Sequence, residues 1–447
     1  MMQTIDLRGS EPTPAALLAS VPRALTSVAV AADIAAELID DVRNRGGVAL
    51  LDQAERLDRV RPNQVRVPAS HIADAVAGLD PAVRTAITET IRRVRLASAA
   101  QVPPSRTTTI EAGATVTQRW QPVKRVGLYV PGGKAVYPSS VVMNVVPAQV
   151  SGVHSIALAS PPQSHFDGRV HPTILAVAGL LGVDEIYAMG GAGAIGALAY
   201  GVVDIGLEPV QIVTGPGNVY VAAAKRLIRG QAGIDSEAGP TDILVIADAA
   251  ADPLLVAADL VSQAEHDELA AAVLVTDSTE LADAVAARLA VLAASTTHTE
   301  RVTAALGGRQ SAIVLVDDLR VAAAFSNAFG PEHLEIQTSD PDGVLELIEN
   351  AGAIFIGPYS PVSLGDYVAG SNHVLPTGGQ ARFSSGLGAY TFLRPQQVVR
   401  YSREALGAVA EHIAALSAAE ALPAHGDAVT ARFETAPFET ARFEADS

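Results

Sequence analysis

The chain has 447 residues, and at about 150 residues per domain this length predicts two to four domains with sizeable cores. It carries 31 Lys and Arg against 48 Asp and Glu, and the formal net charge of −17 disfavours nucleic acid and anionic membrane surfaces as partners. A hydrophobic content of 49% with 18% charged residues is typical of a globular protein and excludes a wholly disordered chain.

The chain contains no cysteine, which excludes disulfides, thiolate metal sites and any mechanism through a cysteine thioester or thiohemiacetal. We expect a cytoplasmic protein, because Asp6 and Arg8 also interrupt the apolar stretch that a secretory signal would need. Residues 186–203 are uncharged and resemble a membrane span in length, but five glycines interrupt them. A buried strand, turn and helix fit that stretch better.

The N-terminal residues predict helices. Apolar residues recur at helical spacing from Ile34 to Val42 and stop at Gly46, while Asp80 and Pro81 supply an N-cap and a first-turn proline for another helix. A chemically plain, exposed stretch follows. We expect residues 1–125 to form a helical segment that packs on the second of two α/β domains.

From residue 126 the pattern changes to short apolar runs that alternate with helical segments, which predicts parallel sheets. The first series of predicted strands reads RVGLYV, HSIALAS, EIYAMGG and VQIVTGPGN, and the second reads DILVIAD, AVLVT, SAIVLV, HLEIQ and AIFIG. The fold class is therefore α/β, with two Rossmann-like, incomplete doubly wound parallel-sheet domains at residues 126–240 and 241–381 and helical segments at both termini.

The C-terminal part carries a weaker signal. Residues 402–416 predict one helix, too little for an independent core, so we expect residues 382–430 to pack on another surface. Residues 431–447 repeat an Arg-Phe-Glu-Thr theme imperfectly, with isolated phenylalanines among charged and small residues. We expect this last stretch to be a disordered, solvated tail.

Three glycine turns follow predicted strands of the first series. Residues 191–196 read G-x-G-x-x-G, but the acidic residue expected about 20 positions later is missing. They are either a dinucleotide fingerprint or a turn that allows close packing. Residues 130–133 and 214–218 either aim backbone N–H groups at a pyrophosphate or serve only as turns.

Two pairs of polar residues could carry chemistry. Gln263 and His266 share one face at a helix end, where a histidine either binds a metal or caps carbonyl groups. Glu332 and His333 open a predicted strand and either divide proton transfer between acid and base or form a surface pair. Other polar candidates lie in a glycine- and serine-rich loop and near the C-terminus, at Asp366, His373, Glu420 and His425.

The order of eight motifs identifies a relationship. They read GLYVPGG, YPSSVVMN, GPGNVYV, AGPTDILVIAD, SQAEHDE, GPEHLEIQ, GDYVAGSNHVLPT and LPAH. This set resembles the histidinol dehydrogenase family over about residues 3 to 430. The resemblance implies an aldehyde-dehydrogenase-like architecture and two successive NAD-dependent hydride removals that convert L-histidinol to L-histidine through L-histidinal, the last step of histidine biosynthesis.

The resemblance also implies a homodimer with one zinc ion per subunit, in which residues 382–430 form the dimerisation segment. Glu332 and His333 would be catalytic: His333 takes the hydroxyl proton and Glu332 activates water to form the aldehyde hydrate. Zinc ligands would be Gln263, His266, Asp366 and His425, the last donated across subunits. Substrate contacts would be Thr241, Gln263, His266, His333, Asp366, His373, Glu420 and His425. Tyr129 and Asn218 match NAD-binding positions of the family.

Two positions depart from the family pattern. Gly193 replaces a glutamine in the turn that reads GGAGAI here, and the loss of one hydrogen bond would weaken NAD binding by ~0.5–1.5 kcal/mol. Asp242 stands where many relatives carry glutamate, which leaves substrate preference open. The alternative functions are a paralogous zinc- and NAD-dependent dehydrogenase acting on another small amino alcohol or diol, a zinc hydrolase with structural glycine turns, and a non-catalytic scaffold.

Overall fold

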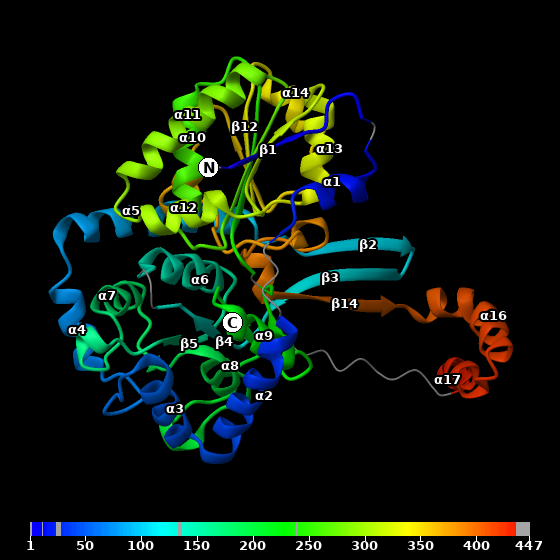
Figure 1. Cartoon of the computed structure of the whole chain (residues 1–447). Coiled ribbons are helices and arrows are strands. Elements are labelled where there is room, and N and C mark those ends of the chain that lie inside the picture. Colours follow the sequence, from blue (N-terminus) through cyan, green and yellow to red (C-terminus); the bar gives the residue numbers. More distant parts are fainter. Residues whose placement is uncertain (1, 11, 24–27, 133–135, 238, 435–447) are drawn as a thin grey trace. The chain divides into compact units, whose positions relative to one another are not determined.

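The computed structural model describes residues 2–10, 12–23, 28–132, 136–237 and 239–434, which divide by their contacts into two units. The first unit comprises Met1–Val102 and Pro122–Phe392, and the second comprises Pro103–Gln121 and Leu393–Ser447. Figure 1 labels their helices and strands. None of the helices in these ranges is long and apolar enough to cross a membrane.

The first sheet has five parallel strands in the order β6-β5-β4-β7-β8. Their bounds are β4 (Arg125–Tyr129), β5 (Ser155–Ser160), β6 (Ile186–Ala188), β7 (Ile212–Thr214) and β8 (Gly233–Ile234). Helices cover both faces, with α6 (Pro138–Val150) and α7 (Pro172–Leu180) on one side and α8 (Gly191–Tyr200) and α9 (Val219–Leu227) on the other (Figure 1). The four strands predicted from apolar runs are confirmed, and β8 is too short to give such a signal.

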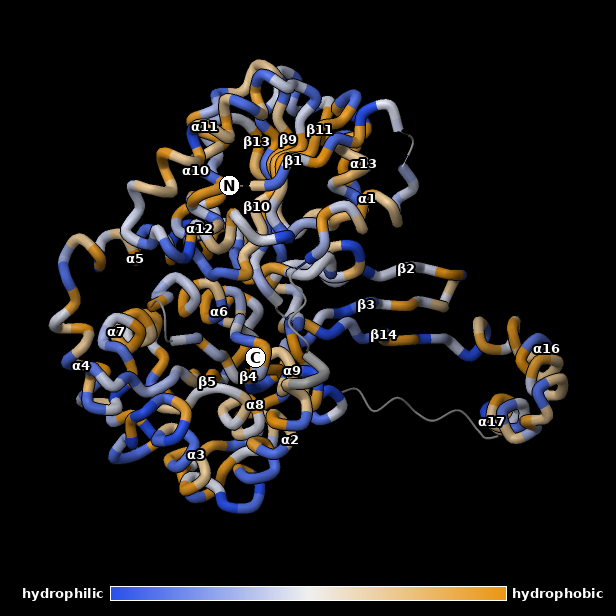
Figure 2. The backbone as a smooth tube through the Cα atoms, viewed as in Figure 1, coloured by the Kyte–Doolittle hydropathy of each residue, from blue (hydrophilic) through white to orange (hydrophobic). Residues whose placement is uncertain are grey.

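The second sheet has six parallel strands in the order β1-β11-β10-β9-β12-β13. They are β1 (Gln3–Asp6), β9 (Asp242–Ala247), β10 (Ala271–Thr276), β11 (Ala312–Leu315), β12 (His333–Gln337) and β13 (Ala353–Ile356). One face packs on α10 (Pro253–Ala264), α11 (Thr279–Ser295) and α12 (Thr299–Gly307), and the other on α1 (Pro14–Ser20), α13 (Leu319–Phe329) and α14 (Pro341–Leu345). Strands β9, β10 and β11 are hydrophobic along nearly their whole length, because helices cover both faces of the sheet (Figure 2).

The N-terminal segment packs differently from the expectation. Only β1 and α1 join the second sheet, where β1 pairs with β11 and α1 contacts α13. The longer helices are α2 (Val28–Arg45), α3 (Gly47–Gln53), α4 (Ala69–Ala77) and α5 (Pro81–Ala100), and they contact helices of the first sheet. The reason is the apolar stripe of Leu38, Ile39 and Val42, which is buried in the same cluster as α8.

The second unit contains a three-stranded sheet and two helices. Its sheet has the order β14-β3-β2, formed by β2 (Arg106–Glu111), β3 (Ala114–Pro122) and β14 (Leu393–Tyr401), with β2 and β3 antiparallel. The predicted helix at 402–416 is confirmed as α16 (Arg403–Ala419), whereas the strands at 106–122 were not predicted. Helix α17 (Pro423–Glu434) includes residues 431–434 of the expected disordered tail, and residues 435–447 lie outside the described residues.

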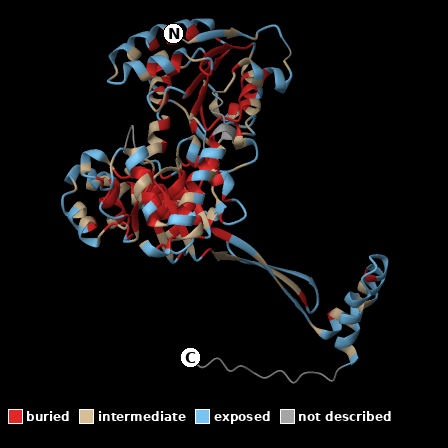
Figure 3. Cartoon of the chain, turned by 60° about the horizontal axis from the view of Figure 1, so that its bottom comes forward, coloured by how far each residue is buried: buried red, intermediate tan, exposed pale blue. Residues whose placement is uncertain are grey.

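The two units differ in how much they bury. In the first unit, buried residues are concentrated in the strands of the two larger sheets and in the helices that cover them (Figure 3). In the described part of the second unit, the buried residues are Ala114, Leu393, Ala405 and Ser417. Such a small set cannot supply a core of the usual size for a domain.

Candidate active site

Glu332 and His333 lie where β9 and β12 begin, because the two strands pair in parallel with His333 opposite Ile243. Glu332 Oε2 accepts a hydrogen bond from the Thr241 hydroxyl at 2.5 Å and another from the Asp242 N–H at 3.1 Å. Burial raises the pKa of Glu332 to about 7, with smaller opposing effects from His333 and Asp242. A carboxyl group with this pKa can take up and release protons near neutral pH.

The hydrogen bonds of two histidines define their tautomers. His333 Nδ1 lies 3.0 Å from the carbonyl oxygen of Asp242, and His266 Nδ1 lies 3.1 Å from that of Ser262. A carbonyl oxygen can only accept, so we assign the proton to Nδ1 in each neutral ring. The lone pair of Nε2 is then available in both, as a proton acceptor in His333 and as a metal ligand in His266.

His373 reaches the same region from the loop after α15 (Val362–Tyr367). Its Nδ1 lies 3.1 Å from the carbonyl oxygen of Asp366, and its Nε2 lies 3.1 Å from Ser140 Oγ, which therefore donates to it. Burial lowers the pKa of His373, whereas the charge of Asp366 and the hydrogen bond with the Asp366 backbone oppose this shift. Sequence reasoning missed Ser140, although its motif YPSSVVMN contributed to the resemblance.

Gln263, His266 and Asp366 offer oxygen and nitrogen donors in one region, because α15 packs against α10. Gln263 is buried and its Nε2 donates to Thr241 Oγ1 at 2.6 Å, while its Oε1 has no hydrogen-bond partner among the described residues. A buried amide oxygen without a partner is unfavourable unless a ligand binds it. This donor set fits zinc, which accepts oxygen and nitrogen ligands.

Two predicted site residues belong to the second unit, where Glu420 caps the end of α16 and His425 lies in α17. Within the described residues, no three His, Asp or Glu side chains alone form a metal-binding group.

The predicted cofactor residues lie at the carboxyl edge of the first sheet. Tyr129 ends β4, and its hydroxyl accepts the N–H of Gly191 at 3.2 Å. Asn218 follows β7 and caps α9 by accepting the N–H groups of Tyr220 and Val221 at 3.1 and 3.2 Å. Strand β4 lies between β5 and β7, and the order of the strands reverses direction at β4. In parallel sheets of this type, nucleotides bind at the carboxyl edge beside such a topological switch point.

A buried ion pair holds the glycine turn after β7. Lys225 and Asp235 form this pair, Lys225 Nζ donates to the Gly215 carbonyl oxygen at 3.0 Å, and Asp235 accepts the Gly215 N–H at 2.9 Å. Gly215 has φ +115, and a Cβ there would lie 1.9 Å from the Tyr129 carbonyl oxygen, so no other residue fits. Sequence reasoning missed the pair, because Lys225 stands beside other basic residues that resemble a solvated helix face.

One cavity of about 110 Å³ joins the two sets of residues. It is lined by the turn residues Gly215, Pro216 and Gly217 and by Thr241, Glu332 and His373. The candidate acid-base groups of the second sheet therefore share a cavity with the candidate nucleotide-binding turn of the first.

The G-x-G-x-x-G pattern has a packing role. A Cβ on Gly193 would lie 2.0 Å from Gln53 Oε1, and one on Gly196 would lie 3.0 Å from Ile39. These two glycines let α8 pack closely on α3 and α2, which is the second of the two interpretations of this turn.

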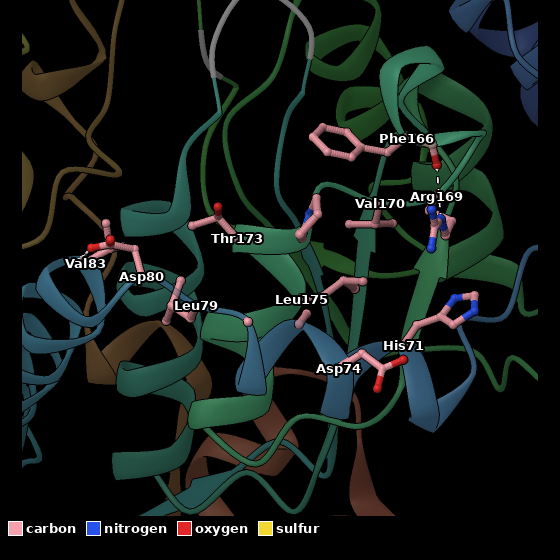
Figure 4. Close-up of a pocket in the computed structure, with 13 residues that line it drawn as sticks. His71, Asp74, Leu79, Asp80, Val83, Phe166, Arg169, Val170, Thr173 and Leu175 are labelled. Carbon is pink, nitrogen blue, oxygen red and sulfur yellow. Dashed lines mark hydrogen bonds between the residues drawn. The ribbon is translucent and has the colours of Figure 1, made fainter.

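A larger pocket of about 360 Å³ lies elsewhere in the first unit (Figure 4). Its lining includes the apolar residues Val170 and Leu175 and the polar residues His71, Asp74 and Arg169. None of the predicted site residues lines this pocket, so its volume does not identify the active site.

Comparisons with known proteins agree with one another. The family model described as histidinol dehydrogenase matches residues 21–433. The chain is 70% identical over 433 residues to histidinol dehydrogenase of Leifsonia xyli subsp. xyli, covering 97% of this chain and 99% of that protein, and 59% identical to that of Thermobifida fusca, covering 97% and 98%. The crystal structure of histidinol dehydrogenase from Elizabethkingia anophelis superposes with a TM-score of 0.91 at 31% identity, covering 97% and 98% of the two chains, which confirms the α/β fold class.

Proposed function

The chain belongs to the histidinol dehydrogenase family, and on this premise we propose that it oxidises L-histidinol to L-histidine through L-histidinal, the last step of histidine biosynthesis. The observation that carries the proposal is the cavity shared by Glu332 and the Gly215–Gly217 turn. It allows a substrate held by acid-base groups to meet a dinucleotide held by the turn. We assign NAD binding to residues 126–240 and the zinc and acid-base groups to residues 241–381.

His333 is the base for the alcohol. Its Nδ1 proton is held by the Asp242 carbonyl oxygen at 3.0 Å, so Nε2 accepts the hydroxyl proton of histidinol as the hydride leaves the same carbon. The ring is buried between two strands, which fixes its orientation.

Glu332 is the base for water in the second oxidation. With a pKa of about 7, its carboxylate removes a proton from the water that adds to the aldehyde, and the resulting hydrate loses the second hydride. Thr241 and the Asp242 N–H hold one carboxylate oxygen and leave the other for water. A thiohemiacetal is excluded as the intermediate, because the chain has no cysteine.

Two groups would complete the site. Gln263, His266, Asp366 and the partner subunit's His425 would hold a zinc ion, which would supply a Lewis acid for the amino alcohol. Tyr129 and Asn218 would contact NAD, which would supply the hydride acceptor for both oxidations. The residues proposed to contact substrate are Thr241, Gln263, His266, His333, Asp366, His373, Glu420 and His425.

We propose that the active form is a homodimer. The second unit contains His425 and Glu420 and buries few of its own side chains, so its helices are expected to bury more surface against another chain. Residues 382–430 are the proposed dimerisation segment. The cytoplasm remains the predicted location.

The direct test is stoichiometric. The purified protein, incubated with limiting L-histidinol and excess NAD, should yield two NADH per histidinol, and a yield of one or none would contradict the mechanism. Treatment with a chelator should abolish turnover, and added zinc should restore it. Turnover of histidinol without NAD would instead favour a hydrolase.

The alternative of another small amino alcohol or diol is not favoured by the site. Asp242, the departure that left substrate preference open, uses its carboxylate oxygens on Arg23 and on the Glu332 N–H. A panel of amino alcohols and diols compared by kcat/KM should therefore rank histidinol first.

A further inference from the structure

Arg23 and Asp242 form an ion pair next to the candidate acid-base residues, because Asp242 is hydrogen-bonded to both Glu332 and His333. Arg23 Nη1 lies 2.5 Å from Asp242 Oδ2, and the side chains are only 13% and 2% exposed. The pair joins two segments that are more than 200 residues apart in the chain. A buried pair of charges costs desolvation energy, so its presence beside a reactive site calls for a specific role.

Arg23 holds the segment that leads into Glu332. Its Nη2 donates to the carbonyl oxygen of Phe329 and, at 3.3 Å, to that of Gly330, where α13 ends. Its guanidinium carbon also lies 3.8 Å from the centre of the Phe329 ring. One guanidinium group therefore fixes the end of α13 and the carboxylate of Asp242 at the same time.

Asp242 contacts both candidate catalytic residues. Its Oδ1 accepts the backbone N–H of Glu332 at 2.7 Å, and its own N–H donates to Glu332 Oε2 at 3.1 Å. Its carbonyl oxygen accepts from His333 Nδ1 at 3.0 Å. Asp242 thus fixes the backbone of Glu332, the carboxylate of Glu332 and the ring of His333.

We propose that Arg23 and Asp242 are positioning residues for the oxidation, and that this ion pair sets the orientation and the proton affinity of Glu332. The proposal rests on the proposed function, because it assigns Glu332 a role in that reaction. It also gives Asp242 a role separate from substrate selection.

The charges around Glu332 predict opposite effects for the two members of the pair. Asp242 raises the pKa of Glu332 and His333 lowers it, while His373 and Asp235 also line the cavity. Removing the charge of Asp242 leaves Arg23 uncompensated, which favours the Glu332 carboxylate. Removing Arg23 leaves the negative charge of Asp242 uncompensated, which favours protonated Glu332.

The test compares pH profiles of kcat/KM for histidinol. Asp242→Asn should move the acidic limb to lower pH by about one unit, and Arg23→Met should move it to higher pH by about one unit. Both should lower kcat more than they change the KM for NAD. Asp242→Glu and Arg23→Lys keep the charges and should leave the limb close to its wild-type position.

The matched control is the pair Arg125–Glu185, which is similarly buried, with side chains 15% and 18% exposed and a distance of 2.5 Å, but lies on the first sheet. Arg125→Met and Glu185→Gln should lower stability without moving the acidic limb. The proposal is wrong if the acidic limb stays at its wild-type pH in both Asp242→Asn and Arg23→Met. It is also wrong if both variants move the limb in the same direction, because the pair would then be merely structural.

A second measurement separates failure of the inference from failure of the proposed function. If the wild-type protein does not oxidise histidinol, the proposed function fails, and the pair is then judged by stability alone. For the wild type, Asp242→Asn and Arg23→Met, the unfolding free energy is measured with and without the additional substitution Glu332→Gln. The difference between the two values, plotted against pH, reports proton binding by Glu332. The midpoint of this curve should shift in opposite directions in the Asp242→Asn and Arg23→Met backgrounds, and equal midpoints would overturn the inference.

Discussion

Substituting Gly193 tests how tightly α8 packs on α3. A Cβ at this position would lie 2.0 Å from Gln53 Oε1, and Gln53 is held by bonds from its Nε2 to the Leu38 carbonyl oxygen at 3.0 Å and to Asp41 at 3.2 Å. Gly193→Ala must therefore displace Gln53. Overpacking should destabilise the fold by about 1–3 kcal/mol and the weakened hydrogen bonds by about 1 kcal/mol. The higher helix propensity of alanine should stabilise it by about 1 kcal/mol. We expect a net loss of about 1–3 kcal/mol in unfolding free energy.

The assay is denaturant unfolding of four proteins: the wild type, Gly193→Ala, Gln53→Ala and the double variant. Once the Gln53 side chain is removed, Gly193→Ala should become neutral or stabilising, so the two substitutions should show a coupling of about 1–3 kcal/mol. Gly307→Ala is the matched control, because Gly307 also lies in a helix but a methyl group added there would meet no atom within 4 Å, and it should stabilise by about 0.4–1 kcal/mol. If Gly193→Ala stabilises the wild-type background as Gly307→Ala does, the steric reasoning is wrong.

Three further predictions concern the site. Folded Glu332 keeps its proton up to about pH 7, whereas the unfolded chain releases it near pH 4.5. The unfolding free energy of the wild type relative to Glu332→Gln should therefore fall by about 3 kcal/mol as pH rises through that range. A difference that does not change with pH would contradict the raised pKa. His266→Ala should lose bound zinc by elemental analysis, whereas exposed His298→Ala should keep it; unchanged metal in His266→Ala would refute the ligand assignment. Lys225→Met leaves Asp235 buried without its partner, so it should lower the unfolding free energy by about 3–5 kcal/mol and weaken NAD binding. The double variant with Asp235→Asn should recover much of that stability. A double variant no more stable than Lys225→Met would argue against the pair.

The parts of the fold that sequence predicts are those where one residue pattern decides the structure. Apolar runs such as DILVIAD and AVLVT form strands, because parallel strands that are covered on both faces need apolar side chains along their length. Strand β2 was missed because its threonines and its arginine are all exposed and show no apolar alternation. Strand β3 follows it after two residues in a hairpin, and only the pairing of β3 with β14 joins segments that are far apart in the chain.

The candidate site shows the same division. Glu332 and Gln263 stand out as polar residues at the ends of predicted elements, and the motif order links them to a family. The role of Arg23 is invisible in sequence, because a single arginine after VP has no periodic partner and contacts Asp242 only through the tertiary fold. The close approach of Gln53 to Gly193 is hidden for the same reason, since α3 and α8 are far apart in the chain.

The ion pair of Lys225 and Asp235 has a consequence for how a cofactor would associate. Because the pair holds both the N–H and the carbonyl group of Gly215, the conformational entropy of that turn is lost during folding and not during ligand binding. The turn should therefore have the same backbone conformation in the free and bound protein, and its amide should exchange hydrogen slowly without ligand. We therefore expect the rate of cofactor association at this edge to be set by diffusion and by the ordering of other loops, because the turn itself does not need to become ordered.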